Sequence, residues 1–188
     1  MPFDVYKHAD AYATGSTVNT YFVAESMDPI TSYYGAKLYP DYTFANAPQA
    51  DILVVPSGLN SMDTDLENTA MISWVSTQAA SAEYVTSHCW GAFTLGGAGL
   101  LDGKKATTFP GYFEDLDSQF PAIDQVVTTR RIVHDGNVIT SNGGLAAGEA
   151  SLYVMGLVFG EQLVDNIAYG LVFADQNLQF AKDPYLVP

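Results

Sequence analysis

Cys89 is the only cysteine in the 188-residue sequence, and it stands where an apolar segment, residues 84–88, meets a segment of small residues, 90–98. The first pattern is typical of a buried strand and the second of a closely packed helix. A side chain on so tight a strand-to-helix turn, a nucleophile elbow, is pushed out of the fold towards the first N–H groups of the helix. Those groups and the helix dipole favour a thiolate, the nucleophilic form of cysteine. Cys89 is therefore the candidate nucleophile, with an inert core cysteine as the alternative.

The three histidines are the candidate bases. His88 directly precedes Cys89, and because adjacent strand residues point to opposite faces, we expect its side chain to turn away from the thiol. His134 lies beside a predicted hairpin turn and His8 on the first predicted helix, and we expect both at the surface.

The elements that must position Cys89 follow a βαβ order. Residues 18–24 and 51–56 are predicted strands, residues 64–80 have helical spacing, and the elbow strand and its helix come next. Asp135-Gly136 between two apolar segments predicts a hairpin. A helix is expected from Gly148 to about residue 169, interrupted near Gly160, and an irregular surface segment at 183–188.

This order predicts a three-layer α/β/α sandwich around a mostly parallel sheet. Ligands bind such folds at the carboxyl ends of the strands, where both Ser57-Gly58 and Cys89 fall.

Composition limits the functional classes. A hydrophobic content of 48% fits one core, and the net charge of −14 argues against a nucleic-acid partner. One cysteine excludes an internal disulfide or a cysteine-based zinc site. No apolar run reaches the roughly 18 residues that cross a bilayer, and the first residues do not resemble a signal peptide, so we expect a cytoplasmic protein without a membrane partner. The glycines at 96–99 do not follow a strand, so they predict no dinucleotide site.

Several motifs in a fixed order carry a family resemblance. They are the elbow at 86–91, Gly99-Leu100-Leu101-Asp102-Gly103-Lys104-Lys105-Ala106-Thr107-Thr108, the hairpin, and Ser141-Asn142-Gly143-Gly144. Together they resemble the ThiJ/PfpI superfamily of class I glutamine-amidotransferase-like proteins, especially isocyanide hydratases and the sensing domains of AraC-type regulators. The resemblance implies a single flavodoxin-like domain over residues 1–188, a homodimer, a small-molecule substrate, and neither metal nor organic cofactor.

The same resemblance implies roles for further residues. Asp4 matches an acidic residue at the start of the first helix, which makes it the acid/base partner of Cys89; the alternative is a helix N-cap. The backbone N–H groups of Gly58 and Trp90 would stabilise developing negative charge. Phe109 and Gly144 would line the substrate pocket.

The chain also departs from the isocyanide hydratase pattern. Trp90 replaces a threonine after the cysteine, Phe109-Pro110 replaces a His-Trp pair, and His88 precedes the cysteine, whereas PfpI-type hydrolases have a histidine after it. The family also begins with a central strand, and almost nothing precedes Asp4 to form one. We expect a native start further upstream; the alternatives are that another segment or subunit fills the gap, or that the fold is rearranged.

The leading hypothesis is a cysteine-dependent hydratase or hydrolase, in which Cys89 attacks a small carbon–nitrogen or carbonyl compound. The alternatives are a non-catalytic metabolite-binding module and a sensor in which Cys89 is oxidised reversibly.

Overall fold

The computed structural model describes residues 1–13, 15–171 and 185–186, and its main sheet has the strand order β11-β9-β10-β6-β5. The strand bounds are Ile52–Val55 (β5), Tyr84–His88 (β6), Ile132–Asp135 (β9), Val138–Ser141 (β10) and Tyr185–Leu186 (β11). β5 and β10 both run parallel to β6, whereas β9 and β10 form the antiparallel hairpin. The predicted mostly parallel sheet and its hairpin are confirmed.

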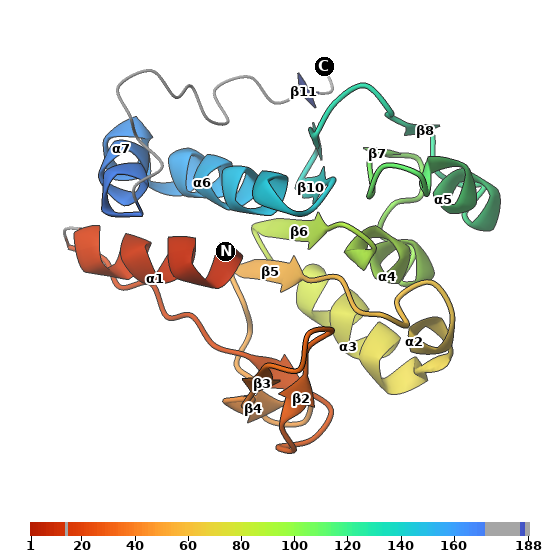
Figure 1. The fold of residues 1–188 in the computed structure, drawn as a ribbon, viewed down its shortest axis with the longest axis horizontal. Helices are drawn as coiled ribbons and strands as arrows, with labels where there is room; N and C mark the ends of the chain where they lie inside the picture. Colours follow the sequence, from red (N-terminus) through yellow and green to blue (C-terminus); the bar gives the residue numbers. More distant parts are fainter. Residues whose placement is uncertain (14, 172–184, 187–188) are drawn as a thin grey trace.

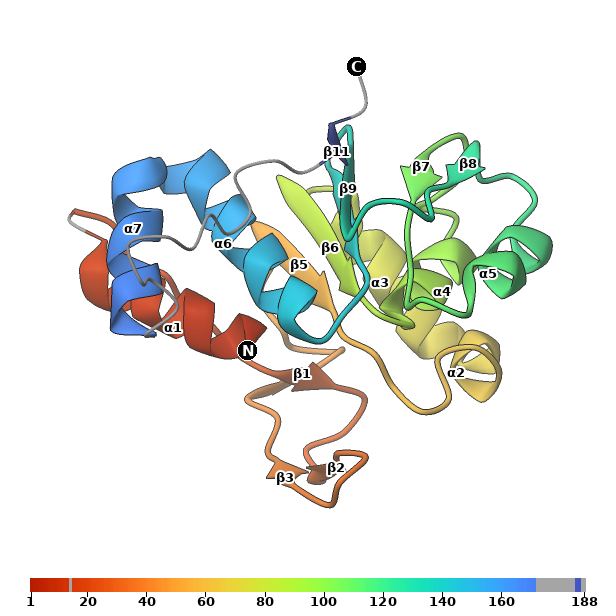
Figure 2. The ribbon, with the colours of Figure 1, turned by 45° about the horizontal axis from the view of Figure 1, so that its top comes forward.

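Helices cover both faces of this sheet, as Figures 1 and 2 show. On one side lie Pro2–Tyr12 (α1), Leu145–Phe159 (α6) and Glu161–Gly170 (α7), which pack on one another. On the other lie Thr64–Glu67 (α2), Thr69–Ala79 (α3) and Gly91–Gly97 (α4). The protein therefore has the predicted three-layer, flavodoxin-like α/β/α architecture.

The continuous apolar run of β5 explains why the sheet is covered twice. Because strand side chains alternate between faces, Leu53 and Val55 enter the core beneath α3 and α4, while Ile52 and Val54 pack against the core formed by α1, α6 and α7. Each core has its own set of buried side chains, and the sheet separates them.

Two small groups of secondary-structure elements extend from the sandwich. One contains Val23–Ala24 (β1), which pairs with Tyr42–Thr43 (β4), and a hairpin of Ile30–Thr31 (β2) and Lys37–Leu38 (β3). It projects from the sandwich at the bottom of Figure 1. The other contains Lys105–Ala106 (β7), Phe113–Gln119 (α5) and Gln125–Val126 (β8), and it lies beyond α4.

The predicted strand at 18–24 is wrong over most of its length, since only Val23 and Ala24 pair. Side-chain carboxylates bind the preceding backbone instead: Val18 N–H donates to Asp10 Oδ1 (2.9 Å) and Phe22 N–H to Asp41 Oδ2 (2.8 Å). These bonds satisfy amide groups that a neighbouring strand would otherwise pair.

The predicted helix at 64–80 is two helices, because Asn68 ends α2 and its side chain caps α3 by accepting from Met71 N–H (3.0 Å). The helix predicted from Gly148 begins at Leu145, directly after Gly144, which adopts φ 57°.

The predicted irregular tail is wrong at Tyr185 and Leu186, which pair with β9; its other residues lie outside the described part of the chain. The absence of the family's central first strand stays a prediction. Among the described residues, β5 lies at one edge of the main sheet. No helix in the described ranges has the length and apolar character that crossing a bilayer requires.

Candidate active site

Cys89 adopts a backbone conformation that L-residues rarely take. Its φ is 56°, and within the described ranges it is the one non-glycine residue with a positive φ. Such a conformation costs roughly 1–2 kcal/mol and persists only where the surrounding structure enforces it. The half-buried Cys89 thus lies on the strained strand-to-helix turn that the sequence predicts.

Hydrogen bonds hold both peptide groups of Cys89. Its N–H donates to the carbonyl of Ser141 (2.9 Å), and the hydroxyl of Thr108 donates to its carbonyl (2.8 Å). Ser141 is the last residue of β10 and Thr108 follows β7, so two separate segments fix the turn.

Two glycines let neighbouring backbone segments approach the turn closely. A Cβ on Gly91 would lie 2.3 Å from the carbonyl oxygen of Val55, at the end of β5. A Cβ on Gly143 would lie 2.5 Å from Cβ of Cys89, and Gly143 has φ +85°. The carboxyl ends of β5, β6 and β10 therefore converge on Cys89.

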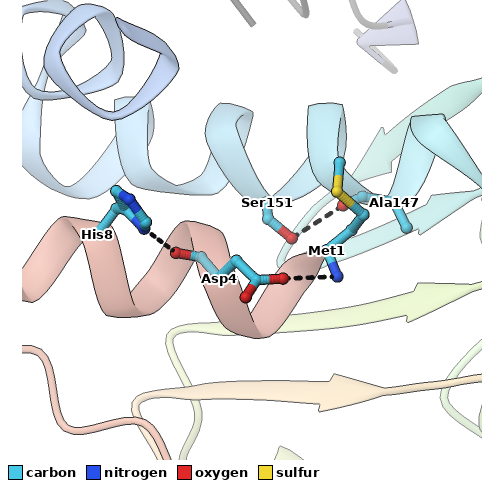
Figure 3. A network of polar contacts seen from close by, with 5 residues as sticks. All are labelled: Met1, Asp4, His8, Ala147 and Ser151. Carbon is cyan, nitrogen blue, oxygen red and sulfur yellow. Dashed lines mark hydrogen bonds and ion pairs between the residues drawn. The ribbon is translucent and has the colours of Figure 1, made fainter. Parts of the chain in front are cut away.

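Asp4 lies in the first turn of α1, three residues after the N-cap Met1, so the alternative that Asp4 is itself the N-cap is wrong. Its carboxylate pairs with the ammonium group of Met1 (3.0 Å), and its side chain is 58% exposed. The carbonyl of Asp4 accepts from His8 Nδ1 (2.9 Å), and α1 lies beside α6 here (Figure 3). Although both residues are described, no hydrogen bond joins Asp4 to Cys89, and their partnership stays a prediction.

The N–H of Gly58, a predicted charge-stabilising donor, is engaged inside the protein. It donates to the buried hydroxyl of Ser61 (2.8 Å), and that hydroxyl lies 3.4 Å from Oδ2 of Asp65. Burial raises the pKa of Asp65. By contrast, the N–H of Trp90 has no hydrogen-bond acceptor within the part of the chain that the structure describes.

Aromatic rings lie on the α4 side of Cys89. The ring of Trp90 meets that of Tyr112 edge to face at 4.9 Å between centroids, and the ring of Phe109 lies 6.2 Å from that of Tyr112. Phe109 is 42% exposed. Tyr112 thus links the predicted pocket residue Phe109 to Trp90. Gly144, the other predicted pocket residue, is exposed, and a Cβ there would contact nothing within 4 Å.

His88 is buried, with 4% of its surface exposed, and its Nδ1 lies 2.9 Å from the hydroxyl oxygen of Ser141. Burial lowers the pKa of His88 to about 4, with a smaller effect from the positive amino terminus. The imidazole is therefore neutral near neutral pH. His134, expected at the surface, is half-buried and bonded to the hydroxyl of Tyr153 (2.9 Å).

Comparison with known proteins decides the family. The model of the DJ-1/PfpI family matches residues 2–155. The chain belongs to this family. The ThiJ/PfpI resemblance of the elbow and its neighbouring motifs is thereby confirmed.

Relatives in the DJ-1/PfpI family differ in what they do. The chain is 37% identical over 139 residues to an isonitrile hydratase of Pseudomonas putida, a match covering 74% of this chain and 58% of the relative. It is 26% identical over 154 residues to the HTH-type transcriptional regulator GbdR of Pseudomonas aeruginosa, covering 82% of this chain and 40% of the regulator. It therefore spans less than two thirds of either relative.

A solved structure of the family supports the fold. The crystal structure of a ThiJ/PfpI family protein from Pseudomonas syringae has a TM-score of 0.79 and 28% identity, and the match covers 95% of this chain and 70% of that one.

The sequence predicts the turn at Cys89 but not the contacts that fix it. Thr108, Ser141 and Gly143 lie within the quoted motifs, but none was predicted to contact Cys89. Gly143, rather than its neighbour Gly144, packs on the cysteine. The sequence feature that indicates this contact is the pair of glycines between a strand and a helix, because glycines at such a turn allow close backbone approach.

Proposed function

We propose that the chain is a cysteine-dependent hydratase of small carbon–nitrogen compounds, with isonitriles as the first substrate class to test. The observation that carries the proposal is the strained turn at Cys89, held by Ser141 and Thr108, in a chain similar to an isonitrile hydratase. Strain that the structure maintains at a half-buried nucleophilic residue is typical of a catalytic site.

The proposed reaction begins with the thiolate of Cys89 attacking the terminal carbon of the isonitrile, R–N≡C. A proton added to the same carbon gives a thioimidate, R–N=CH–S–Cys89. Water then adds to that carbon while the nitrogen takes a proton. The carbon–sulfur bond breaks and its electron pair returns to sulfur, while the hydroxyl proton on the same carbon returns to the acid/base residue, and the product is the formamide R–NH–CHO. The net change is addition of one water.

In this proposal the free N–H of Trp90 stabilises negative charge that develops beside Cys89, because unpaired donors at such a position lower the barrier without reorganisation. Gly58 N–H remains a second proposed donor, and it must leave Ser61 to act. Phe109 is proposed as an apolar wall of the substrate pocket, and Gly144 as part of its rim.

Asp4 is proposed as the residue that supplies and recovers the proton. In the structure its carboxylate is paired with the Met1 ammonium, so this role requires that pair to open. Asp10 offers a matched control, because it lies on the same helix and, among the described residues, its carboxylate accepts only from Val18 N–H, a bond that an asparagine can also accept.

Turnover of alkyl and aryl isonitriles to formamides tests the proposal. We expect formamide from the wild type, none above background from Cys89→Ser, reduced turnover from Asp4→Asn and unchanged turnover from Asp10→Asn. Thermal unfolding of each variant controls for loss of the fold. Absence of turnover by the wild type with every isonitrile would overturn the isonitrile proposal, and equal losses in both aspartate variants would remove Asp4 from it.

The similarity to GbdR favours a second candidate, a metabolite-binding module without turnover. Under this candidate, Cys89→Ser would bind a small molecule with the affinity of the wild type. Reversible oxidation of Cys89 by peroxide without any turnover would instead favour the redox sensor.

A further inference from the structure

His88 is an unusual residue for its position in the fold. It ends β6, directly before Cys89, and faces the core beneath α1 and α6, where the neighbouring strands present apolar side chains such as Val54 and Ile139. Burying an imidazole costs free energy that an aliphatic residue would not require. Its Nε2 has no hydrogen-bond partner within the described residues, so Nδ1 makes the one polar contact of this side chain.

That contact and the backbone of Cys89 converge on one residue. Ser141 pairs with His88 in the parallel register of β6 and β10, and it is fully buried. Its carbonyl accepts from the N–H of Cys89 at 2.9 Å, and its hydroxyl oxygen lies 2.9 Å from Nδ1 of His88. The same hydroxyl donates to the carbonyl of Ser87 at 3.4 Å, which leaves its oxygen free to accept a hydrogen bond from the Nδ1–H of a neutral imidazole.

We propose that His88 is a positioning residue, which acts through Ser141 to hold Cys89 in its reactive geometry. The imidazole fixes the side chain of Ser141, and Ser141 in turn fixes the amide of the strained turn and the start of the Asn142-Gly143 segment that packs on the cysteine. The low pKa of His88 agrees with this role, because a neutral ring positions its neighbour without adding charge. The inference rests on the proposed function only in that both concern the reactivity of Cys89.

Three substitutions separate the parts of the imidazole. His88→Asn retains an N–H close to the position of Nδ1, His88→Gln places its amide near the position of Nε2, and His88→Phe retains a flat ring without any donor. Ser141→Ala removes the same hydrogen bond from the other side. The double variant His88→Phe with Ser141→Ala tests whether the two residues act as one unit.

The measurement is the second-order rate of alkylation of Cys89 by iodoacetamide, from about pH 6 to about pH 10, with thermal unfolding in parallel. We expect His88→Asn to stay within about twofold of the wild type, and His88→Phe, His88→Gln and Ser141→Ala to react on the order of tenfold more slowly at the alkaline plateau. The double variant should react no more slowly than either single variant.

His134→Phe is the matched control. His134 also lies in the main sheet and bonds through Nδ1, to Tyr153, but it belongs to β9 and has no contact with Cys89 among the described residues. We expect His134→Phe to lower the melting temperature and leave the alkylation rate unchanged.

Wild-type alkylation by folded His88→Phe, or a His88→Asn rate as low as that of His88→Phe, would overturn the proposal. Equal slowing by His134→Phe would also overturn it, because the effect would then be general destabilisation. If His88→Phe does not fold, Ser141→Ala and His88→Asn still decide the question. Alkylation of Cys89 requires no turnover. The positioning role of His88 can therefore be tested even if the hydratase proposal fails.

Discussion

At the scale of single residues, the structure confirms the position of Cys89 on a strand-to-helix turn and shows what enforces it. The sequence predicted the turn because both flanking segments are local patterns. It did not predict Ser141 and Thr108 as partners of the cysteine, since Thr108 lies 19 residues away in sequence and Ser141 lies on the strand that pairs with β6. Contacts between distant segments depend on strand order, which no short motif specifies.

The buried imidazole of His88 predicts a dependence of stability on pH. The unfolded chain binds a proton at His88 below about pH 6.5, whereas the folded protein resists protonation until about pH 4. The unfolding free energy should therefore fall as the pH is lowered through this window, by about 3 kcal/mol from this residue. Above about pH 6.5 His88 contributes no such dependence.

Denaturant titrations of the wild type and His88→Phe test this effect. The loss of unfolding free energy between about pH 7 and about pH 4 should be smaller in His88→Phe by roughly 3 kcal/mol. Comparison of the two proteins cancels the contribution of the many carboxylates. An identical loss in both would show that His88 titrates normally in the folded protein.

At the scale of elements, the predictable parts are those with long or distinctive patterns. The apolar run of β5, the elbow strand β6 and the Asp135-Gly136 hairpin were predicted where the structure has them. The short strands β2 to β4 were not predicted, because two-residue strands have no periodicity. β1 was predicted only as the end of a longer strand at 18–24, because side-chain carboxylates of Asp10 and Asp41 bind the backbone that precedes it.

The turn between β10 and α6 offers a matched pair of glycines. Both have positive φ, but a Cβ on Gly143 would collide with Cys89 and a Cβ on Gly144 would contact nothing. Gly144→Ala should cost about 1–3 kcal/mol from backbone strain alone, because φ 57° with ψ −131° is a conformation that glycine favours. Gly143→Ala should cost more than Gly144→Ala and slow alkylation of Cys89, because the turn must also shift to relieve the contact.

Denaturant unfolding and iodoacetamide alkylation of the two glycine variants check this expectation. Equal stability and equal alkylation rates in Gly143→Ala and Gly144→Ala would show that the contact between Gly143 and Cys89 does not hold the turn.

At the scale of the whole molecule, the 21 carboxylates outnumber the seven basic residues, which gives a net charge of −14. Like charges repel across the surface, and salt screens them: the screening length falls from about 30 Å at 0.01 M to about 10 Å at 0.1 M. The melting temperature should therefore rise as sodium chloride increases over this range. Scanning calorimetry measures the change, and a fall in melting temperature would mean that specific ion pairs outweigh net repulsion.

The predicted homodimer also belongs to this scale, and sedimentation equilibrium would test it against the chain mass of 20.2 kDa. Tyr33-Tyr34, Tyr39 and Tyr42 form an aromatic cluster in the sequence, for which a dimer interface, core packing and loop anchoring are the alternatives. All four tyrosines are exposed, so core packing does not explain them; Tyr33 contacts Tyr34 edge to face, and Tyr42 contacts Tyr21 in the same way.

The central claim is that Cys89 forms a covalent intermediate during hydration of a carbon–nitrogen substrate. The most direct measurement is a rapid-quench single turnover with an isotopically labelled aryl isonitrile, followed by mass spectrometry of the protein and of the product. The proposed function predicts a transient adduct on the peptide that contains Cys89, with the mass of the isonitrile added, which decays as labelled formamide forms, and neither species with Cys89→Ala. Formamide produced at the wild-type rate by Cys89→Ala, or an adduct that never yields formamide, would contradict it.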